Sequence, residues 1–217
     1  MRTYKIHFIR HGITEGNSEG RYIGVTDLPL SSAGALELET VKNEGFLPNV
    51  GLVFTSPLLR CRESAELLYP GSDPIEIDEW REYDFGDFDG KSVLELEALR
   101  EYKDWTSGRV PSPPNGEDPS EFTKRICLGL NKAVRKMMEL DITEAAAVMH
   151  GGIIMSLFAA SALPRRQTVE WVCDAGCGYT ARITPSLYGR SGVIEIIDTV
   201  PTSFEGTDDT EGGEYDE

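Results

Sequence analysis

Histidine and cysteine are scarce in this 217-residue chain, and long apolar runs are missing. No run reaches 18 apolar residues, which argues against a transmembrane helix, and the first residues lack the apolar core of a signal peptide. We therefore expect a cytoplasmic protein with no membrane partner. The four cysteines fit neither a zinc site nor a Cys-x-x-Cys redox pair, so free, mostly structural thiols are expected at Cys61, Cys127, Cys173 and Cys177.

Basic residues are also few, 21 against 37 acidic residues, giving a net charge of −16. Nucleic-acid binding needs a basic face, so we do not expect this protein to bind nucleic acid. Seven of the acids lie in residues 205–217, which hold no Lys or Arg. Such a segment has little to bury. We predict one folded domain over 1–203 and a flexible acidic tail over 204–217, with a docking tail for a basic partner as the alternative.

Short apolar runs alternate with helical patterns along the chain. This alternation indicates βαβ units, an α/β fold and a mostly parallel sheet covered on both faces. Strands are expected at 4–9, 52–54, 75–77, 145–149, 179–183 and 193–197, the last two joined by a Pro/Gly turn. Helices are expected at 31–45 with Ser31 or Ser32 as N-cap, 57–69 with Pro57 in its first turn, 91–105, 119–140 and 151–162.

Three of the predicted strands are followed directly by segments with potentially reactive side chains, namely Arg10-His11, Ser56 to Arg60 and His150-Gly151. Reactive groups of α/β folds gather at the carboxyl ends of the strands. Both histidines are followed by glycine, which lets the backbone approach a ligand closely. These three strand ends are therefore expected to meet in one site.

A neutral imidazole can attack phosphorus and form a phosphohistidine. The transferring group carries negative charge, which arginine can hold through two parallel N–H bonds. His11 is thus predicted to be the nucleophile, with Arg10 and Arg60 as phosphate ligands. Arg60 lies in the first turn of a predicted helix, where anions are favoured. His150 could add a further donor if it is protonated.

The leaving oxygen needs a proton, which one carboxyl group can supply before activating water. The acidic stretch at 79–90 offers several candidates among which spacing does not choose: Glu79, Glu82, Asp84, Asp87 and Asp89. The stretch also contains the aromatic residues Tyr83, Phe85 and Phe88. We expect these residues and Tyr22 to pack and anchor loops rather than to stack on the substrate.

Two further features favour ordinary roles. His7 lies inside the first strand and is expected to be structural, and the Pro-rich loop at 110–119 is a rim, a lid or a plain connection. A metal site is not expected, because no His-x-His or His-x-x-x-His spacing occurs and arginines beside the histidines would repel a cation.

Five motifs in order resemble the histidine phosphatase superfamily, in its phosphoglycerate-mutase-like branch. They lie at Ile9–Asn17, Gly20–Ser31, Thr55–Ala65, Arg81–Gly86 and Met149–Gly152. The resemblance covers about residues 4–200. It implies a three-layer α/β/α sandwich with a mostly parallel mixed sheet, and no metal or organic cofactor.

The resemblance also assigns roles by motif position. His11 matches the phosphorylated nucleophile and Glu82 the proton donor and acceptor, while the phosphate pocket is matched by Arg10, Arg60 and His150. Polar and glycine positions of the phosphate or substrate site are matched by Thr14, Asn17, Gly24 and Gly151. This chain departs from the family's usual Gln-Thr-Ala at Glu63-Ser64-Ala65 and from Phe-Gly-x-Trp-Glu-Gly at 85–90, which bears on substrate preference more than on catalysis.

We therefore expect a metal-independent phosphomonoester phosphatase of the histidine acid type, acting on a small phosphorylated metabolite such as α-ribazole phosphate or a sugar phosphate. One alternative is a phosphoglycerate mutase. Such relatives carry a longer, basic insert before the second histidine, whereas residues 83–149 span 67 positions here and begin acidic. The other alternative is a catalytically silent phospho-ligand binding protein. Oligomeric state is not readable from the sequence.

Overall fold

The computed structural model describes residues 2–44 and 47–201. Within them, one mixed sheet has the strand order β3-β2-β4-β1-β6-β7-β5. Strands β1 to β4 pair in parallel, as do β5 and β7, while β6 runs antiparallel to β1 and β7. The strand bounds are Tyr4–Arg10 (β1), Val53–Thr55 (β2), Ile75–Glu76 (β3), Glu144–Met149 (β4), Ala162–Leu163 (β5), Gly178–Ile183 (β6) and Ile194–Val200 (β7).

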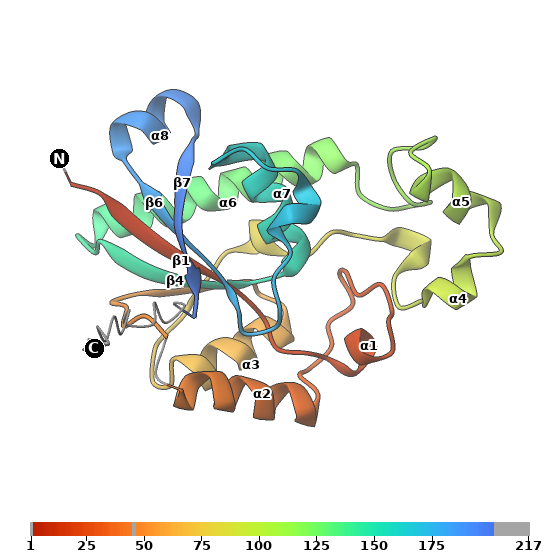
Figure 1. Cartoon of the computed structure of the whole chain (residues 1–217), viewed down its shortest axis with the longest axis horizontal. Coiled ribbons are helices and arrows are strands. Elements are labelled where there is room, and N and C mark those ends of the chain that lie inside the picture. The colour runs from red at the N-terminus through yellow and green to blue at the C-terminus, as the bar shows by residue number, and fades with distance from the viewer. Residues whose placement is uncertain (1, 45–46, 202–217) are drawn as a thin grey trace, which may run out of the picture.

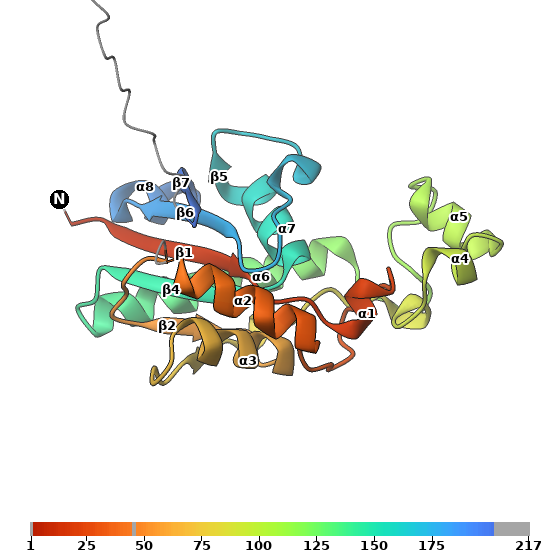
Figure 2. The same ribbon diagram turned by 60° about the horizontal axis from the view of Figure 1, so that its bottom comes forward.

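Helices cover both faces of this sheet, which confirms the predicted three-layer α/β/α architecture. Helices α2 and α3 lie side by side below the sheet and α6 and α7 lie on the opposite face, whereas α4 and α5 project beyond the strands (Figures 1 and 2). The bounds are Glu15–Ser18 (α1), Ser32–Asn43 (α2), Leu59–Leu68 (α3), Val93–Leu96 (α4), Arg100–Thr106 (α5), Pro119–Glu139 (α6), Gly151–Ser161 (α7) and Pro185–Ser191 (α8), with 3₁₀ turns at Asp78–Trp80, Gly86–Phe88 and Thr168–Trp171.

The central strands bury side chains on both faces, and their alternation divides the core in two. In β1, Ile6 and Phe8 belong to the larger cluster beneath α6 and α7, whereas Ile9 packs with Leu38 of α2 on the other face. Successive side chains of a strand point to opposite faces. This explains why the buried strands are nearly continuous apolar runs rather than alternating ones.

The helix starts follow capping chemistry. Ser31 accepts from the Gly34 N–H and caps α2, as predicted. Asp118 caps α6, whose first residue is Pro119. Proline suits this position because the amide it lacks would have no partner inside the helix.

Several predicted elements are corrected. The helix expected at 91–105 is in fact two short helices. Ser92 and Glu95 form a capping box at the start of α4, and a second helix, α5, begins at Arg100. Leu96 and Tyr102 are thereby both buried against Phe88. The break folds the two helices around this small cluster instead of extending them as one.

Two boundaries and one connection also differ from expectation. Pro57 precedes α3 instead of lying in its first turn, because the helix begins at Leu59. The link between β6 and β7 is not a turn but helix α8, which starts at Pro185, ends at Ser191 and is capped by Gly192 in the left-handed conformation (φ 66°). The short elements α1 and β5 were not predicted from the sequence.

The predicted acidic tail lies outside the described residues. Within the described ranges, no helix combines the length and apolarity needed to cross a bilayer. The four cysteines are free, as expected, and Cys61 is fully buried.

Candidate active site

The carboxyl ends of three adjacent parallel strands bring the predicted residues together. The His11 N–H donates to the Met149 carbonyl at 2.9 Å, and the Ser56 N–H donates to the Val148 carbonyl at 3.0 Å. These bonds continue the β1–β4 and β2–β4 ladders by one residue past each strand. The side chains of residues 11, 56 and 150 consequently converge at one edge of the sheet.

The ring of His11 is held in one tautomer. Its Nδ1 lies 2.6 Å from the Gly12 carbonyl oxygen, which can only accept, so Nδ1 carries the hydrogen. Its Nε2 accepts from Nε of Arg60 at 3.2 Å and therefore bears the lone pair. His11 as a whole is 5 % exposed. It thus presents an unprotonated Nε2 in a fixed orientation, as a nucleophile requires.

Arg60 lies at the second position of α3 and is 1 % exposed. Its two terminal nitrogens donate to backbone carbonyls, Nη1 to Thr26 at 2.9 Å and Nη2 to Gly24 at 2.8 Å. Its Nε is shared between two histidine rings, His11 Nε2 and His150 Nδ1, both at 3.2 Å. A buried guanidinium is therefore fixed between the two histidines.

His150 is completely buried. Since its Nδ1 accepts from Arg60, the ring hydrogen is on Nε2, which lies 2.7 Å from the Ser56 hydroxyl. Burial, together with the Arg60 charge, holds the pKa of His150 well below its usual value. A protonated ring would place a second positive charge against Arg60, so this arrangement favours the neutral form, and the role of His150 toward phosphate stays a prediction.

The same causes act on the nucleophile. Burial, reinforced by the Arg60 charge, lowers the pKa of His11 to about 3. The ring is neutral across the physiological range, which leaves its lone pair available for attack.

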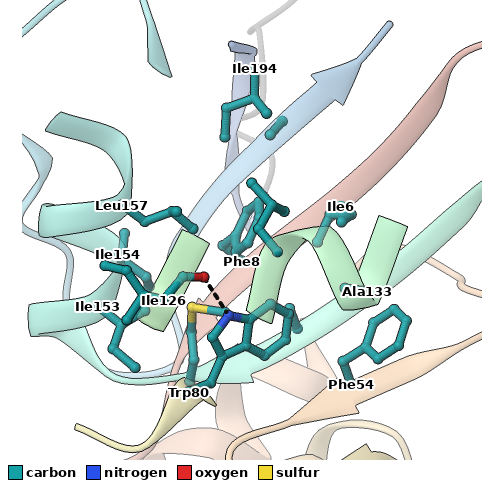
Figure 3. Close-up of a cluster of buried hydrophobic side chains, with 14 of the residues drawn as sticks. Ile6, Phe8, Phe54, Trp80, Ile126, Ala133, Ile153, Ile154, Leu157 and Ile194 are labelled. Atoms are coloured by element: carbon teal, nitrogen blue, oxygen red, sulfur yellow. Dashed lines mark hydrogen bonds between the residues drawn. The ribbon is translucent and has the colours of Figure 1, made fainter. Parts of the chain in front are cut away.

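Glu82 follows a buried anchor. Two residues before it, Trp80 is fully buried and its Nε1 donates to the Ile126 carbonyl of α6 at 3.4 Å, as Figure 3 shows. The indole packs directly over Gly129, where a Cβ atom would lie 2.5 Å from Nε1. The absence of a side chain at Gly129 therefore lets the Trp80 indole pack close to α6, and this fixes the position at which the acidic loop begins.

Glu82 is 7 % exposed, and its carboxylate reaches the amino end of α7. It accepts from the Tyr83 N–H at 2.8 Å and the Gly152 N–H at 3.1 Å. Burial raises the pKa of Glu82 despite these bonds and the nearby arginines. A carboxyl group with a raised pKa suits general acid and base work.

Arg10 is anchored by the segment that precedes β6. Its Nη1 donates to the Cys173 carbonyl at 2.8 Å, its N–H donates to Cys177 and its carbonyl accepts from Gly176. Gly151 faces this side chain, with a Cβ position 3.4 Å from the Arg10 Nε. Arg10 is half-buried, and its charge acts to lower the pKa of both His11 and Glu82.

Thr14 and Asn17 form a capping box around α1, in which each side chain bonds the other residue's N–H. The Thr14 hydroxyl also donates to Asn17 Oδ1 at 3.0 Å. Gly24 supplies a carbonyl to Arg60 and an N–H to Asp89, at 2.8 and 2.6 Å. Their roles toward phosphate or substrate stay predictions, and what these contacts show is support for the loop that holds Arg60.

The remaining acids of the 79–90 stretch are engaged in structural bonds. Asp89 holds Gly24 and Thr26, Asp84 accepts from Gly86, and Asp87 accepts from Asn115. Glu79 pairs with Lys132. Glu82 is thereby distinguished from its neighbours by burial at the site.

His7 bonds Thr180 at 2.9 Å and Glu144 at 3.0 Å within the sheet, in keeping with the structural role expected for it. In the part of the chain that the structure describes, no group of three or more His, Cys, Asp or Glu side chains could hold a metal ion.

Sequence reasoning missed several supporting residues. Ser64 accepts from the Gly12 N–H at 2.9 Å and donates to the Arg60 carbonyl, so it links the His11 loop to α3. Asp27 accepts from the Leu59 N–H and caps α3 in place of a local side chain. Gly152 makes room for Glu82, since a Cβ there would lie 2.6 Å from Oε1. The departures noted at Glu63-Ser64 could have flagged Ser64, whereas the long-range cap at Asp27 leaves no local pattern.

A cavity of about 670 Å³ opens beside Glu82 and Gly152. Its wall includes Tyr22, Tyr83 and Phe85, whereas Phe88 is buried behind it in the cluster with Leu96. Pro111 and Pro119 also line it, so the Pro-rich loop forms part of the rim.

Comparison with known proteins defines the class of this chain. A model of the histidine phosphatase superfamily (branch 1) matches residues 6–185. The chain belongs to this family. Its predicted phosphoglycerate-mutase-like fold is confirmed by the crystal structure of phosphoglycerate mutase from Thermus thermophilus, which shares 27% identity and a TM-score of 0.63 over 90% of this chain and 97% of that one.

Two curated relatives are phosphatases. Sedoheptulose 1,7-bisphosphatase of Saccharomyces cerevisiae is 34% identical over 61% of this chain and 55% of that enzyme, so the match spans about half of its length. The adenosylcobalamin/α-ribazole phosphatase of Salmonella typhimurium is 27% identical over 80% of this chain and 87% of that enzyme. The family and these relatives support a phosphatase.

Proposed function

We propose that this protein is a metal-independent phosphomonoester phosphatase that works through a phosphohistidine on His11. The observation that carries the proposal is the state of the His11 ring. Its hydrogen is fixed on Nδ1 by the Gly12 carbonyl, and its lone pair on Nε2 faces the Arg60 guanidinium. The nucleophilic nitrogen of His11 therefore lies next to a cation that can hold the phosphoryl oxygens.

In the first step, His11 Nε2 attacks phosphorus, an N–P bond forms and the bond from phosphorus to the alcohol oxygen breaks. Arg10 and Arg60 hold the transferring oxygens, and neutral His150 completes the pocket. Protonated Glu82 gives its proton to the leaving oxygen. In the second step, ionised Glu82 takes a proton from water, the water oxygen attacks phosphorus, and inorganic phosphate leaves as the N–P bond breaks.

The substrate class is a small phosphorylated metabolite, such as α-ribazole phosphate or a sugar phosphate. This rests on the relatives named above, of which one is an α-ribazole phosphatase and one a sedoheptulose bisphosphatase. The binding roles of Thr14, Asn17, Gly24 and Gly151 belong to the same proposal.

The test uses p-nitrophenyl phosphate with and without a chelator. Wild type should release phosphate equally in both, and His11→Ala should not. Quenching wild type during turnover under alkaline denaturing conditions should trap a phosphoryl group on His11, which mass spectrometry can locate. Full activity of His11→Ala, or complete loss of wild-type activity with the chelator, contradicts the proposal.

A mutase is the second candidate, favoured by the likeness to the Thermus enzyme. Incubation with 3-phosphoglycerate separates the two activities, because a mutase yields 2-phosphoglycerate and a phosphatase yields glycerate. Retained phosphate binding without turnover of any ester would instead support a silent phospho-ligand binding protein.

A further inference from the structure

The cavity beside Glu82 is walled by aromatic rings. Tyr22, Phe85 and Trp105 are half-buried and line it together with Tyr83 and Phe122. The rings touch in succession, with centroid separations of 5.1 Å for Tyr22–Phe85 and 5.2 Å for both Tyr83–Phe85 and Tyr83–Phe122. Together they form a continuous aromatic wall that extends from Tyr83, next to Glu82, to Trp105 on helix α5.

The wall is made by segments that are distant in sequence. Trp105 is on α5 and lies 5.7 Å from the ring of Tyr22, which precedes the Arg60-binding loop. The cavity is also lined by small residues of α7, Ser156, Ala159 and Ala160. Because these α7 side chains are short, they leave room in the cavity for a flat group against the rings.

Of the described residues that line this cavity, only Glu82 and Arg21 are charged. Arg21 is already committed, since it donates to Glu19 at 2.6 Å and to Glu95 at 2.8 Å. Its Nη1 also donates to the Gly90 carbonyl. The cavity therefore offers no uncommitted cation to a second phosphate or a carboxylate.

A smaller cavity of about 390 Å³ reaches Glu82 from another side and contains two arginines. Arg125 pairs with Glu117 through two nitrogens, and Arg81 bonds Asp78. Asp84 and Glu117 line the same space and would repel a second anion. This route too is poorly suited to a bisphosphate.

The position of the aromatic wall relative to the chemistry decides what it would hold. Glu82 gives its proton to the leaving oxygen, so the alcohol portion of the ester must extend from phosphorus on the Glu82 side. The aromatic cavity begins on that side, at Glu82 and Gly152. We propose that it binds the alcohol portion of the substrate, and that this portion carries a planar aromatic or heteroaromatic ring and no second acidic group.

This inference rests on the proposed phosphatase function and selects among its substrates. The ring would stack on Tyr22, Phe85 and Trp105, and aromatic pairs contribute about 0.5–1.5 kcal/mol beyond the burial of their area. Trp105 is the specificity-determining residue in this scheme, because α5 brings it from outside the family motifs.

The experiment compares esters of primary alcohols with similar leaving-group basicity: ethyl phosphate, 2-phenylethyl phosphate, 2-cyclohexylethyl phosphate and propane-1,3-diyl bisphosphate. We expect kcat/KM to be highest for the phenyl ester, by about 10-fold over ethyl phosphate and by about 3-fold or more over the cyclohexyl ester. Equal values for the three monoesters, or a preference for the bisphosphate, would overturn the inference.

Two variants test the cavity itself. Trp105→Leu removes a ring from the wall, and Ala160→Leu adds bulk at an exposed residue of the cavity lining. Each should reduce the preference for the phenyl ester over ethyl phosphate by about 5-fold or more while ethyl phosphate is still hydrolysed. Ala33→Leu is the matched control, because Ala33 is exposed on α2 across the sheet. A preference unchanged in Ala160→Leu, even if Trp105→Leu fails to fold, contradicts the inference.

Calorimetry with 2-phenylethylphosphonate and ethylphosphonate, which cannot be hydrolysed, separates this inference from the phosphatase proposal. Ring-dependent binding without turnover of any ester would refute the hydrolytic function alone. Turnover of all esters with no ring-dependent binding would refute the aromatic site alone.

Discussion

The Nε atom of Arg60 lies 3.2 Å from His11 Nε2 and 3.2 Å from His150 Nδ1, so one N–H bond is shared by two histidine rings. Neither ring can take up a proton on that nitrogen without facing the guanidinium charge. In the proposed reaction, this N–H must turn from the rings to a phosphoryl oxygen before the His11 lone pair can attack. Arg60 thus keeps the nucleophile neutral and is placed to hold the group it attacks.

Replacing Arg60 by lysine should lower kcat/KM for p-nitrophenyl phosphate by about 100-fold or more, because a single ammonium cannot reproduce the planar fork. The carbonyls of Gly24 and Thr26 would also lose their donors. Steady-state kinetics measure the effect. Arg62→Lys is the matched control, since Arg62 is exposed on the same helix. Activity of Arg60→Lys within about 2-fold of wild type would show that the fork is not needed.

Glu82→Gln removes the proton donor while an amide oxygen can still accept from Gly152. We expect kcat for ethyl phosphate to fall by about 10²–10⁴-fold, and the loss to be smaller for p-nitrophenyl phosphate, whose leaving group needs no proton. The pKa of Glu82 is raised by burial. In wild type, hydrolysis of ethyl phosphate should decline as the pH rises through that raised pKa.

The Glu82→Gln variant should lack this alkaline decline, which a pH–rate profile measures. Asp84→Asn is the control from the same loop, because the Asp84 carboxylate accepts from the Gly86 N–H within its own turn. An identical alkaline limb in wild type and Glu82→Gln would assign the proton transfer to another group.

Ser64→Ala should destabilise the fold by about 1–3 kcal/mol, because the buried Gly12 N–H loses its acceptor. The same change releases the His11 loop from α3, so kcat should fall as well. Ser64→Thr keeps the hydroxyl and should restore both properties. Urea unfolding and steady-state kinetics test this, and an alanine variant with wild-type stability would mean that the bond is dispensable.

Acid should weaken the fold through its buried histidines. The pKa of His11 is lowered to about 3, while an unfolded histidine titrates near 6.5. Between these values the unfolded chain binds a proton that folded His11 does not, so the free energy of unfolding falls as the pH falls. Each such histidine removes about 1.4 kcal/mol between about pH 7.5 and 5.5.

Urea unfolding at the two pH values measures this loss. His11→Asn should reduce it by about 1.4 kcal/mol relative to wild type, because one titrating group is gone. The raised pKa of Glu82 acts in the opposite direction, since folded Glu82 binds a proton that the unfolded chain has released. Comparing variant with wild type cancels that contribution. An equal pH dependence in both proteins would contradict the assigned state of His11.

The sequence predicted the α/β class, the longer strands and most helix starts, because these follow from local rules. Ser31, for example, caps α2 through the Gly34 N–H three residues away, and buried strands appear as short apolar runs. The motif matches also pointed to residues 10, 11, 60, 82 and 150. Prediction failed at 91–105, where burial of Leu96 and Tyr102 against Phe88 breaks a pattern that looks continuous in sequence.

The amino-acid sequence by itself determined which reactive groups the protein has and placed them directly after predicted strands. Only the tertiary structure decided their protonation and their surroundings. Arg60 meets His11 and His150 across 49 and 90 residues, and Trp105 meets Tyr22 across the cavity wall. A pKa depends on burial and on neighbouring charge, and a binding wall on rings from distant segments, and both are properties of packing that no local pattern encodes.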